Sequence, residues 1–274
     1  MARLGPNDPA VARDFESVGF NAFNADELKK AQLSFERAVA IRVASQGASH
    51  PRVAEDLNTL GAIAYLQGNM KLAESSYRRA LRSYEVVLGP NHPEVANTSN
   101  NLARILLERR RYREALPLLE RAVAIILKEK GMEHDDFVFP SYNLALVKDA
   151  LGSSSDAELL LRQSLRAARL HKHRNLAPIL TDLADIRCRS GAVDEGLQLL
   201  EEAGPIMTRI YGADPWRTAW VESTRGECFG RGKDTILARR LLRSSTPILV
   251  ERWGANGHFG AIAKARLDRS GVGL

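Results

Sequence analysis

The sequence predicts an all-α solenoid of about six helical hairpins that is closed by one further helix. The clearest sign is a repeat, because His50–Ala54 returns 42 residues later as His92–Ala96 with histidine, proline, valine and alanine in the same places. A fixed period of this length indicates an array of supersecondary units. Two apolar stripes of helical spacing occupy each period, and small residues recur at fixed places in both stripes.

The repeat that begins at His50 shows how one hairpin forms. Residues 52–66 carry apolar side chains three and four positions apart, which predicts a first helix with one buried face. Pro51 suits the first turn of that helix, where a missing N–H is no loss. A turn at residues 67–69 interrupts the pattern, and residues 71–88 predict a second helix that ends at Gly89.

Small residues mark where paired helices approach each other. The first helices carry Gly19, Gly61, Ala103, Ala145, Ala184 and Gly226 in one register. The second helices carry Ala31, Ala73, Ala115, Ala157, Gly196 and Ala238. Bulky residues follow these on the second helices, namely Phe35, Tyr77, Leu119, Leu161, Leu200 and Leu242. A large side chain at a small position would push the helices apart, because protein interiors tolerate little excess volume.

The register divides residues 1–274 into a single array. The expected repeats cover residues 8–49, 50–91, 92–133, 134–172, 173–213 and 214–255, and a closing helix covers 256–270. The fourth repeat lacks the proline after its histidine, so its first helix is expected to begin near Pro140. In the first repeat, Phe15, Phe20 and Phe23 either pack against the next hairpin or mark chain that once preceded them.

This pattern resembles the tetratricopeptide repeat in its long form, as found in kinesin light chains. The residues that carry the resemblance are His92–Ala96, Asn100–Ala103, Arg111–Ala115 and Glu120–Ala122. The resemblance covers nearly the whole chain. It implies a right-handed superhelix of hairpins, with an inner groove that binds a peptide or a partner protein.

The resemblance also implies which residues contact the ligand, because inward-facing positions of the first helices do so in this family. By register these are Asn58, Ala62 and Tyr65, then Asn97, Asn100 and Arg104, then Tyr142, Leu146 and Asp149. An asparagine amide can both donate to and accept from a peptide backbone. Arg104 can bind a carboxylate through two hydrogen bonds. The alternative interpretation is that these are simply solvated polar positions.

No set of residues suggests catalysis, and we expect no enzyme, cofactor or metal. His50, His92 and His134 fall on separate loops, one per repeat, which predicts a structural role. The segment from Gly226 to Lys233 lacks the spacing of a phosphate-binding loop, and Asp234 stands where that loop needs serine or threonine.

Composition is that of an ordinary globular protein, with 45% hydrophobic and 26% charged residues and a net charge of +6. Arg109–Arg111 with Arg113 forms a dense basic cluster at a turn. Nucleic-acid binding there is an alternative, but no aromatic-and-basic recognition motif accompanies the cluster. The chain has no membrane-spanning stretch and no secretion signal, so a cytoplasmic location is expected. Cys188 and Cys228 are therefore expected to be free thiols.

A second resemblance concerns the last third of the chain. Trp216–Ala219, Gly226–Cys228 and Leu241–Leu242 are similar to the C-terminal repeat regions of some bacterial serine/threonine protein kinases. The leading hypothesis is an adaptor that binds a peptide or partner protein in its groove. The alternative is a detached, non-catalytic sensor arm of such a kinase.

Overall fold

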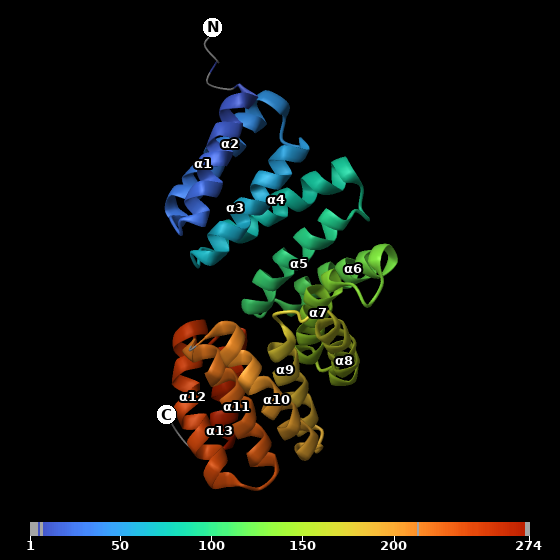
Figure 1. Ribbon diagram of the computed structural model, residues 1–274, viewed down its shortest axis with the longest axis vertical. Coiled ribbons are helices and arrows are strands. Elements are labelled where there is room, and N and C mark those ends of the chain that lie inside the picture. Colours follow the sequence, from blue (N-terminus) through green and yellow to red (C-terminus); the bar gives the residue numbers. More distant parts are fainter. Residues whose placement is uncertain (1–4, 6–7, 213, 272–274) are drawn as a thin grey trace. The chain divides into compact units, whose positions relative to one another are not determined.

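The computed structural model describes residues 5, 8–212 and 214–271. Within these residues the chain forms thirteen α-helices and one short 3-10 helix, and no strand (Figure 1). The helices are α1 (Pro9–Asn24), α2 (Leu28–Gln46), α3 (Pro51–Leu66), α4 (Met70–Leu88), α5 (Pro93–Glu108), α6 (Tyr112–Lys130), η1 (Asp135–Phe137), α7 (Val138–Ala150), α8 (Ser154–Leu170), α9 (Leu176–Arg189), α10 (Val193–Tyr211), α11 (Pro215–Arg231), α12 (Thr235–Trp253) and α13 (His258–Arg269). The predicted all-α architecture of helical hairpins with a closing helix is confirmed.

The chain divides into two compact units, which we call the N-terminal and the C-terminal lobe. The N-terminal lobe comprises Met1–Ile105 and Leu118–Ile125, and the C-terminal lobe comprises Leu106–Pro117 and Ile126–Leu274. Within the N-terminal lobe α1 pairs with α2 and α3 with α4, and within the C-terminal lobe α7 pairs with α8, α9 with α10 and α11 with α12. A single array over residues 1–274 remains a prediction.

The histidine at the start of several repeats caps the first helix. The imidazole Nδ1 accepts a hydrogen bond from the backbone N–H two residues further on. The distances are 3.2 Å for His50 at α3, 3.2 Å for His92 at α5 and 3.1 Å for His134 at η1. His173 makes the same contact over 3.0 Å with Asn175, in the turn just before α9. Such a cap satisfies one of the N–H groups that a helix leaves without an intrahelical partner. The predicted structural role of the three repeat histidines is therefore confirmed.

The small-to-bulky pairing closes each hairpin. A Cβ atom added to Gly61 would lie 2.8 Å from the Tyr77 ring, and one added to Gly226 would lie 2.8 Å from Leu242 Cγ. The first hairpin repeats this arrangement with Gly19 and Phe35, at 2.7 Å. These contacts leave no room for a Cβ atom, which explains why the first helices carry glycine at these three places.

A buried ion pair lies inside the N-terminal lobe. Arg42 on α2 donates to Asp56 on α3, and both side chains are almost fully buried. Arg42 also donates to Glu16 on α1 over 2.5 Å. Burial raises the pKa of Asp56 to about 6, although the hydrogen bond and charge of Arg42 act in the opposite direction.

The aromatic residues of α1 pack mainly within their own hairpin. Phe15 contacts the cluster of Ala12, Ala38 and Ile41, and Phe20 packs edge-on against Phe35 with ring centroids 5.1 Å apart. Phe20 nevertheless remains 44% exposed.

In the C-terminal lobe, α7 begins late and α13 closes the last hairpin. The 3-10 helix η1 comes first, and α7 begins at Val138, close to the predicted start at Pro140. The closing helix packs mainly against α12, with Leu267 on Leu242. Ala263 and Phe259 of α13 pack with Trp220 of α11.

The two cysteines form a disulfide, so the expectation of free thiols is wrong. Cys188 on α9 and Cys228 on α11 are joined, with a Cα–Cα distance of 5.1 Å, and both side chains are fully buried. Repeat stacking places the first helices of consecutive hairpins side by side, which brings the two residues within reach of each other.

Among the described residues, no helix combines the length and the apolarity that a membrane crossing requires.

Candidate functional site

Five of the predicted ligand-binding residues lie on two neighbouring first helices of the N-terminal lobe. Asn58 and Tyr65 are on α3, and Asn97, Asn100 and Arg104 are on α5. The Arg104 guanidinium lies 4.0 Å above the centre of the Tyr65 ring. This cation–π contact brings the two predicted residues together from consecutive repeats. In the middle of α3, the Asn58 carboxamide oxygen lies 3.5 Å from the Thr98 hydroxyl of α5.

The polar side chains on α5 differ in exposure and in whether their buried donors have a hydrogen-bond acceptor. Asn97 is exposed, and Asn100 and Arg104 are half-buried. The Arg104 Nε atom is buried and has no hydrogen-bond acceptor among the described residues, and the same holds for the Ser99 hydroxyl. A buried donor without an acceptor costs free energy, which a ligand that supplies the acceptor would recover.

Tyr142 is placed differently from the other predicted residues. It lies on α7 in the C-terminal lobe and is only 8% exposed. Its hydroxyl donates a hydrogen bond of 2.5 Å to Asp182 on α9. Burial raises the pKa of Tyr142 well above its usual range, so the hydroxyl keeps its proton and remains a donor.

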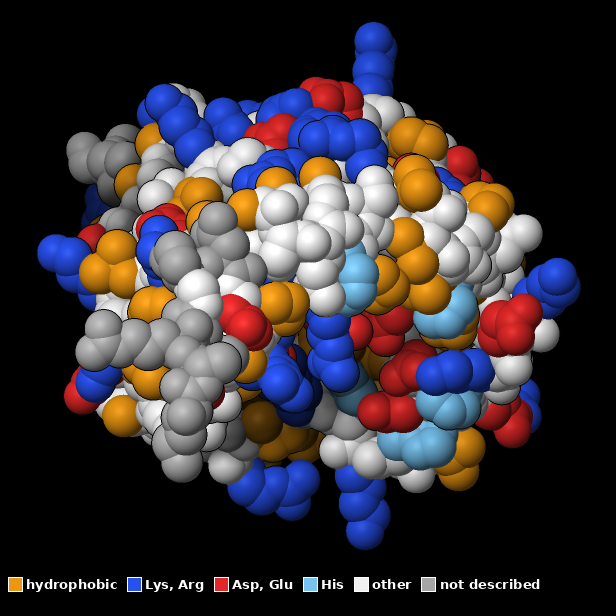
Figure 2. All heavy atoms as spheres, turned by 90° about the horizontal axis from the view of Figure 1, so that it is seen from above, with side chains coloured by type: hydrophobic (Ala, Val, Ile, Leu, Met, Phe, Trp, Pro, Cys, Tyr) orange, Lys and Arg blue, Asp and Glu red, His pale blue; other side chains and the backbone are white. Residues whose placement is uncertain are grey.

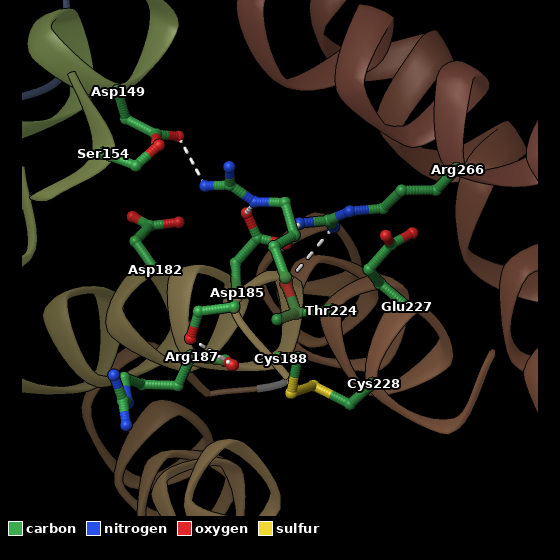
Figure 3. A network of polar contacts seen from close by, with 12 residues as sticks. Asp149, Ser154, Asp182, Asp185, Arg187, Cys188, Thr224, Glu227, Cys228 and Arg266 are labelled. Carbon is green, nitrogen blue, oxygen red and sulfur yellow. Dashed lines mark hydrogen bonds and ion pairs between the residues drawn. A yellow bond between two sulfur atoms is a disulfide. The ribbon is translucent and has the colours of Figure 1, made fainter. Parts of the chain in front are cut away.

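Tyr142 borders a buried carboxylate network that sequence reasoning did not identify, and Figure 3 shows its members Asp149, Asp182 and Asp185. Asp182 accepts from Tyr142 and, over 2.9 Å, from Trp220 Nε1. Neither of these donors carries a charge. Burial therefore raises the pKa of Asp182 to about 7, and the two hydrogen bonds only partly oppose this shift.

Asp185, one helical turn further along α9, has the opposite environment. It accepts from Arg266 over 2.6 Å and from Arg189 over 2.9 Å. Burial alone would raise the pKa of Asp185, but the charges and hydrogen bonds of Arg266 and Arg189 outweigh it and leave the pKa below its usual range. Two neighbouring carboxyl groups on one helix thus have pKa values shifted in opposite directions.

The network extends to α7 and to the closing helix. Arg189 also donates to Asp149 over 2.7 Å, and Asp149 accepts from Ser154 over 2.6 Å. Figure 3 shows Arg266 reaching from α13 toward Asp185 and Thr224. It donates to the Thr224 hydroxyl over 3.2 Å, and its guanidinium lies 4.6 Å above the Trp220 ring.

These groups line a cavity of about 290 Å³ in the C-terminal lobe. Its walls include the predicted residues Leu146 and Asp149 of α7, as well as Asp182 and Asp185 of α9 and Trp220 of α11. On one side His258 of α13 shares a hydrogen bond of 2.9 Å with the Tyr112 hydroxyl. Burial lowers the pKa of His258 to about 4, so this imidazole is neutral at physiological pH. A volume near 300 Å³ is at the small end of the range for ligand sites.

Two acidic residues of this lobe hold a register position that the sequence analysis had singled out. Arg104 directly follows the small residue Ala103 on its helix, and Asp185 follows Ala184 and Glu227 follows Gly226 in the same way. Arginines of α13 bind both of these carboxylates, Arg266 at Asp185 and Arg269 at Glu227 over 3.0 Å. Their position directly after the small residue of each first helix was the sequence signal that could have identified Asp185 and Glu227.

The arginine-rich turn between α5 and α6 is partly neutralised. Arg111 pairs with Glu114, with hydrogen bonds of 2.7 and 2.6 Å. On the face shown in Figure 2, basic side chains are interspersed with acidic ones.

In the part of the chain that the structure describes, no three histidine, cysteine or acidic side chains gather into a metal-binding group.

Comparison with known proteins agrees with this geometry. The model of the tetratricopeptide repeat family matches residues 15–85 and 55–128. Residues 15–128 are thus similar in sequence to tetratricopeptide repeats. The predicted resemblance to that family is thereby confirmed. A search of curated protein sequences gave no match. The similarity of the last third to kinase-linked repeats remains untested.

Solved structures extend the similarity in fold to the rest of the chain. The crystal structure of RapI in its apo form covers 94% of this chain and 99% of its own, with a TM-score of 0.71 and 15% identity. A Rap protein complexed with Competence and Sporulation Factor covers 94% and 74%, with a TM-score of 0.60 and 15% identity. The nearly identical repeats of a putative kinesin light chain from Podosopora anserina cover 74% and 98%, with a TM-score of 0.56 and 21% identity.

Proposed function

We propose that this protein is a non-catalytic adaptor that binds a peptide segment of another protein. The site is the surface formed by α3 and α5 of the N-terminal lobe, which carries Asn58, Tyr65, Asn97, Asn100 and Arg104. The observation that carries the proposal is the placement of Arg104 over Tyr65, with a buried Nε–H that lacks an acceptor among the described residues. A peptide carbonyl or carboxylate supplies that acceptor.

Several further findings support the proposal. Repeats of this family use stacked hairpins to present an extended binding surface. One structurally similar protein, the Rap protein, was solved in complex with Competence and Sporulation Factor. Asparagine side chains at two consecutive turns of α5 offer both donors and acceptors to an extended backbone.

A display selection followed by a titration tests this proposal. Random peptides are selected on the full-length chain, and the selected peptides are titrated against an Asn100→Ala, Arg104→Ala double variant. The matched control is Asn91→Ala with Arg82→Ala, because both residues are exposed and lie outside α3 and α5. We expect the site variant to bind at least about ten-fold more weakly, since a charged hydrogen bond contributes 1.5–3 kcal/mol. Equal affinity of the two variants would exclude this surface as the site.

The cytoplasmic location and the kinase-arm alternative remain proposals. The buried disulfide weighs against a reducing compartment, because such bonds persist mainly in oxidising ones. Sequencing the genes beside the native locus for a kinase domain tests the alternative.

A further inference from the structure

A cleft of about 530 Å³ opens between α11, α12 and α13, and it adjoins the cavity described above, with which it shares Arg266 and Arg269. We call it the arginine cleft. Its walls carry Arg231 from α11, Arg239 from α12 and Arg269 from α13, and its floor includes Gly226, Gly230 and Ala238. The small size of these three residues means that they occupy little of the space.

The charge of the cleft is strongly positive. Glu227 is the acidic side chain among its lining residues, and this carboxylate accepts from Arg231 over 3.1 Å and from Arg269 over 3.0 Å. Arg266 also lines the cleft, but Asp185 neutralises it from the other side. Arg231, Arg239 and Arg269 against the one carboxylate leave an excess of two positive charges.

The three arginines are held in place while keeping donors for a ligand. Glu227, only 6% exposed, fixes Arg231 through Nε and Arg269 through one Nη atom. The Arg239 Nε atom donates to the Ser270 carbonyl over 3.0 Å. Within residues 8–212 and 214–271 these are the hydrogen bonds of the three guanidinium groups, so both Nη groups of Arg231 and Arg239 remain available. Fixed, planar guanidinium groups are the preferred partners of phosphate oxygens.

We propose that the arginine cleft binds a phosphate monoester group. Three guanidinium groups from three helices surround the space, and a dianionic tetrahedral group accepts from all of them. A ligand carboxylate carries one negative charge and would neutralise only half of the excess of two positive charges. The group belongs either to a small organic phosphate or to a phosphorylated side chain of a bound peptide. This site lies outside the α3–α5 surface and does not depend on the function proposed for it.

Isothermal titration of the full chain tests the proposal with O-phospho-L-serine, a blocked phosphoserine tripeptide and the unphosphorylated tripeptide. The test variant is Arg231→Gln with Arg239→Gln, which keeps a polar side chain at each position but removes two charges. The matched control is Arg240→Gln with Arg243→Gln, two exposed arginines of α12 that do not line the cleft. Circular dichroism and thermal unfolding establish that all variants are folded.

We expect saturable binding of the phosphorylated probes and none of the unphosphorylated tripeptide. The test variant should bind at least about ten-fold more weakly, because charge-assisted hydrogen bonds are lost, and the control should stay within about two-fold of the unmodified protein. Equal affinities for phosphoserine and its tripeptide assign the site to a small organic phosphate, and tighter binding of the tripeptide assigns it to a phosphorylated partner. Absence of saturable binding, or equal weakening in both variants, overturns the proposal.

Discussion

The two lobes use the same register position in opposite ways. In the N-terminal lobe the residue after the small first-helix position is Ala62 in one repeat and Arg104 in the next, and Arg104 stacks on Tyr65 and keeps a buried N–H without an acceptor among the described residues. In the C-terminal lobe this position holds Leu146, Asp185 and Glu227, and arginines of α13 bind the two carboxylates. At Asp185 and Glu227 the chain's own α13 thus binds the side chains at this position, whereas Arg104 keeps a donor for a ligand. The Arg104 donor is therefore the basis of the proposed peptide site.

The largest expected effect comes from breaking the buried pair of the C-terminal lobe. Asp185→Ala leaves the Arg266 guanidinium, which is 1% exposed, with hydroxyl acceptors alone, and we expect a loss of about 3–5 kcal/mol in unfolding free energy. Asp56→Ala in the N-terminal lobe should cost less, because Arg42 keeps Glu16. Urea unfolding followed by tryptophan fluorescence reports on the C-terminal lobe, where all three tryptophans lie.

A double variant controls for this measurement. Asp185→Leu with Arg266→Met removes both charges and should recover most of the lost stability, because a buried pair often contributes little over an apolar replacement. If Asp185→Ala costs less than about 1 kcal/mol, the pair does not hold α13 in place and the comparison between the lobes fails.

Loss of the disulfide should have the next largest effect. Reduction, or Cys188→Ser with Cys228→Ser, opens a loop of 40 residues and should lower the unfolding free energy by about 3–4 kcal/mol. The effect should appear in tryptophan fluorescence of the C-terminal lobe. Alkylation of the denatured protein before reduction, followed by mass spectrometry, checks the bond directly. Two alkylated cysteines in protein purified without reductant would contradict it.

The pH dependence of the unfolding free energy distinguishes Asp182 from its neighbour Asp185. Its pKa is about 7 in the folded protein and near 4 when unfolded, so the folded state binds the extra proton between these values. The contribution of Asp182 to stability is therefore full below about pH 4 and falls as the pH rises to about 7. Asp182→Asn should remove this slope and gain up to about 3 kcal/mol over the unmodified protein above pH 7. Parallel stability curves for the two proteins between pH 4 and 8 would show that Asp182 is not held protonated.

Two glycines give the smallest expected effects. Gly61→Ala places a Cβ atom 2.8 Å from the Tyr77 ring and should cost about 1–3 kcal/mol. Gly230→Ala, exposed in α11 with its nearest contact at 3.7 Å to Ala238, should instead stabilise by about 0.5–1 kcal/mol through helix propensity. Thermal unfolding by circular dichroism measures both. A gain from Gly61→Ala would mean that the helices do not approach as closely as the small-to-bulky register requires.

The sequence predicts the hairpins well because the same physical requirement recurs in each repeat. A glycine or alanine faces a bulky residue, and a histidine at the start of a helix accepts a backbone N–H. The C-terminal network could not be predicted in this way, because it joins residues that do not recur. Asp185 and Arg266 lie 81 residues apart, and Arg266 belongs to a helix without a counterpart in the other repeats. The disulfide was missed because the expected compartment, rather than the stacking of α9 on α11, decided that prediction.

Hydrogen–deuterium exchange with a selected peptide tests the central claim most directly. The inward positions of the first helices in the N-terminal lobe should form the peptide site. We therefore predict that the bound peptide slows exchange in α3 and in residues 93–105 of α5, with Asn100 and Arg104 at the centre, and leaves α2 and α4 unchanged. Protection of the second helices, with α3 and α5 exchanging as in the free protein, would contradict the account.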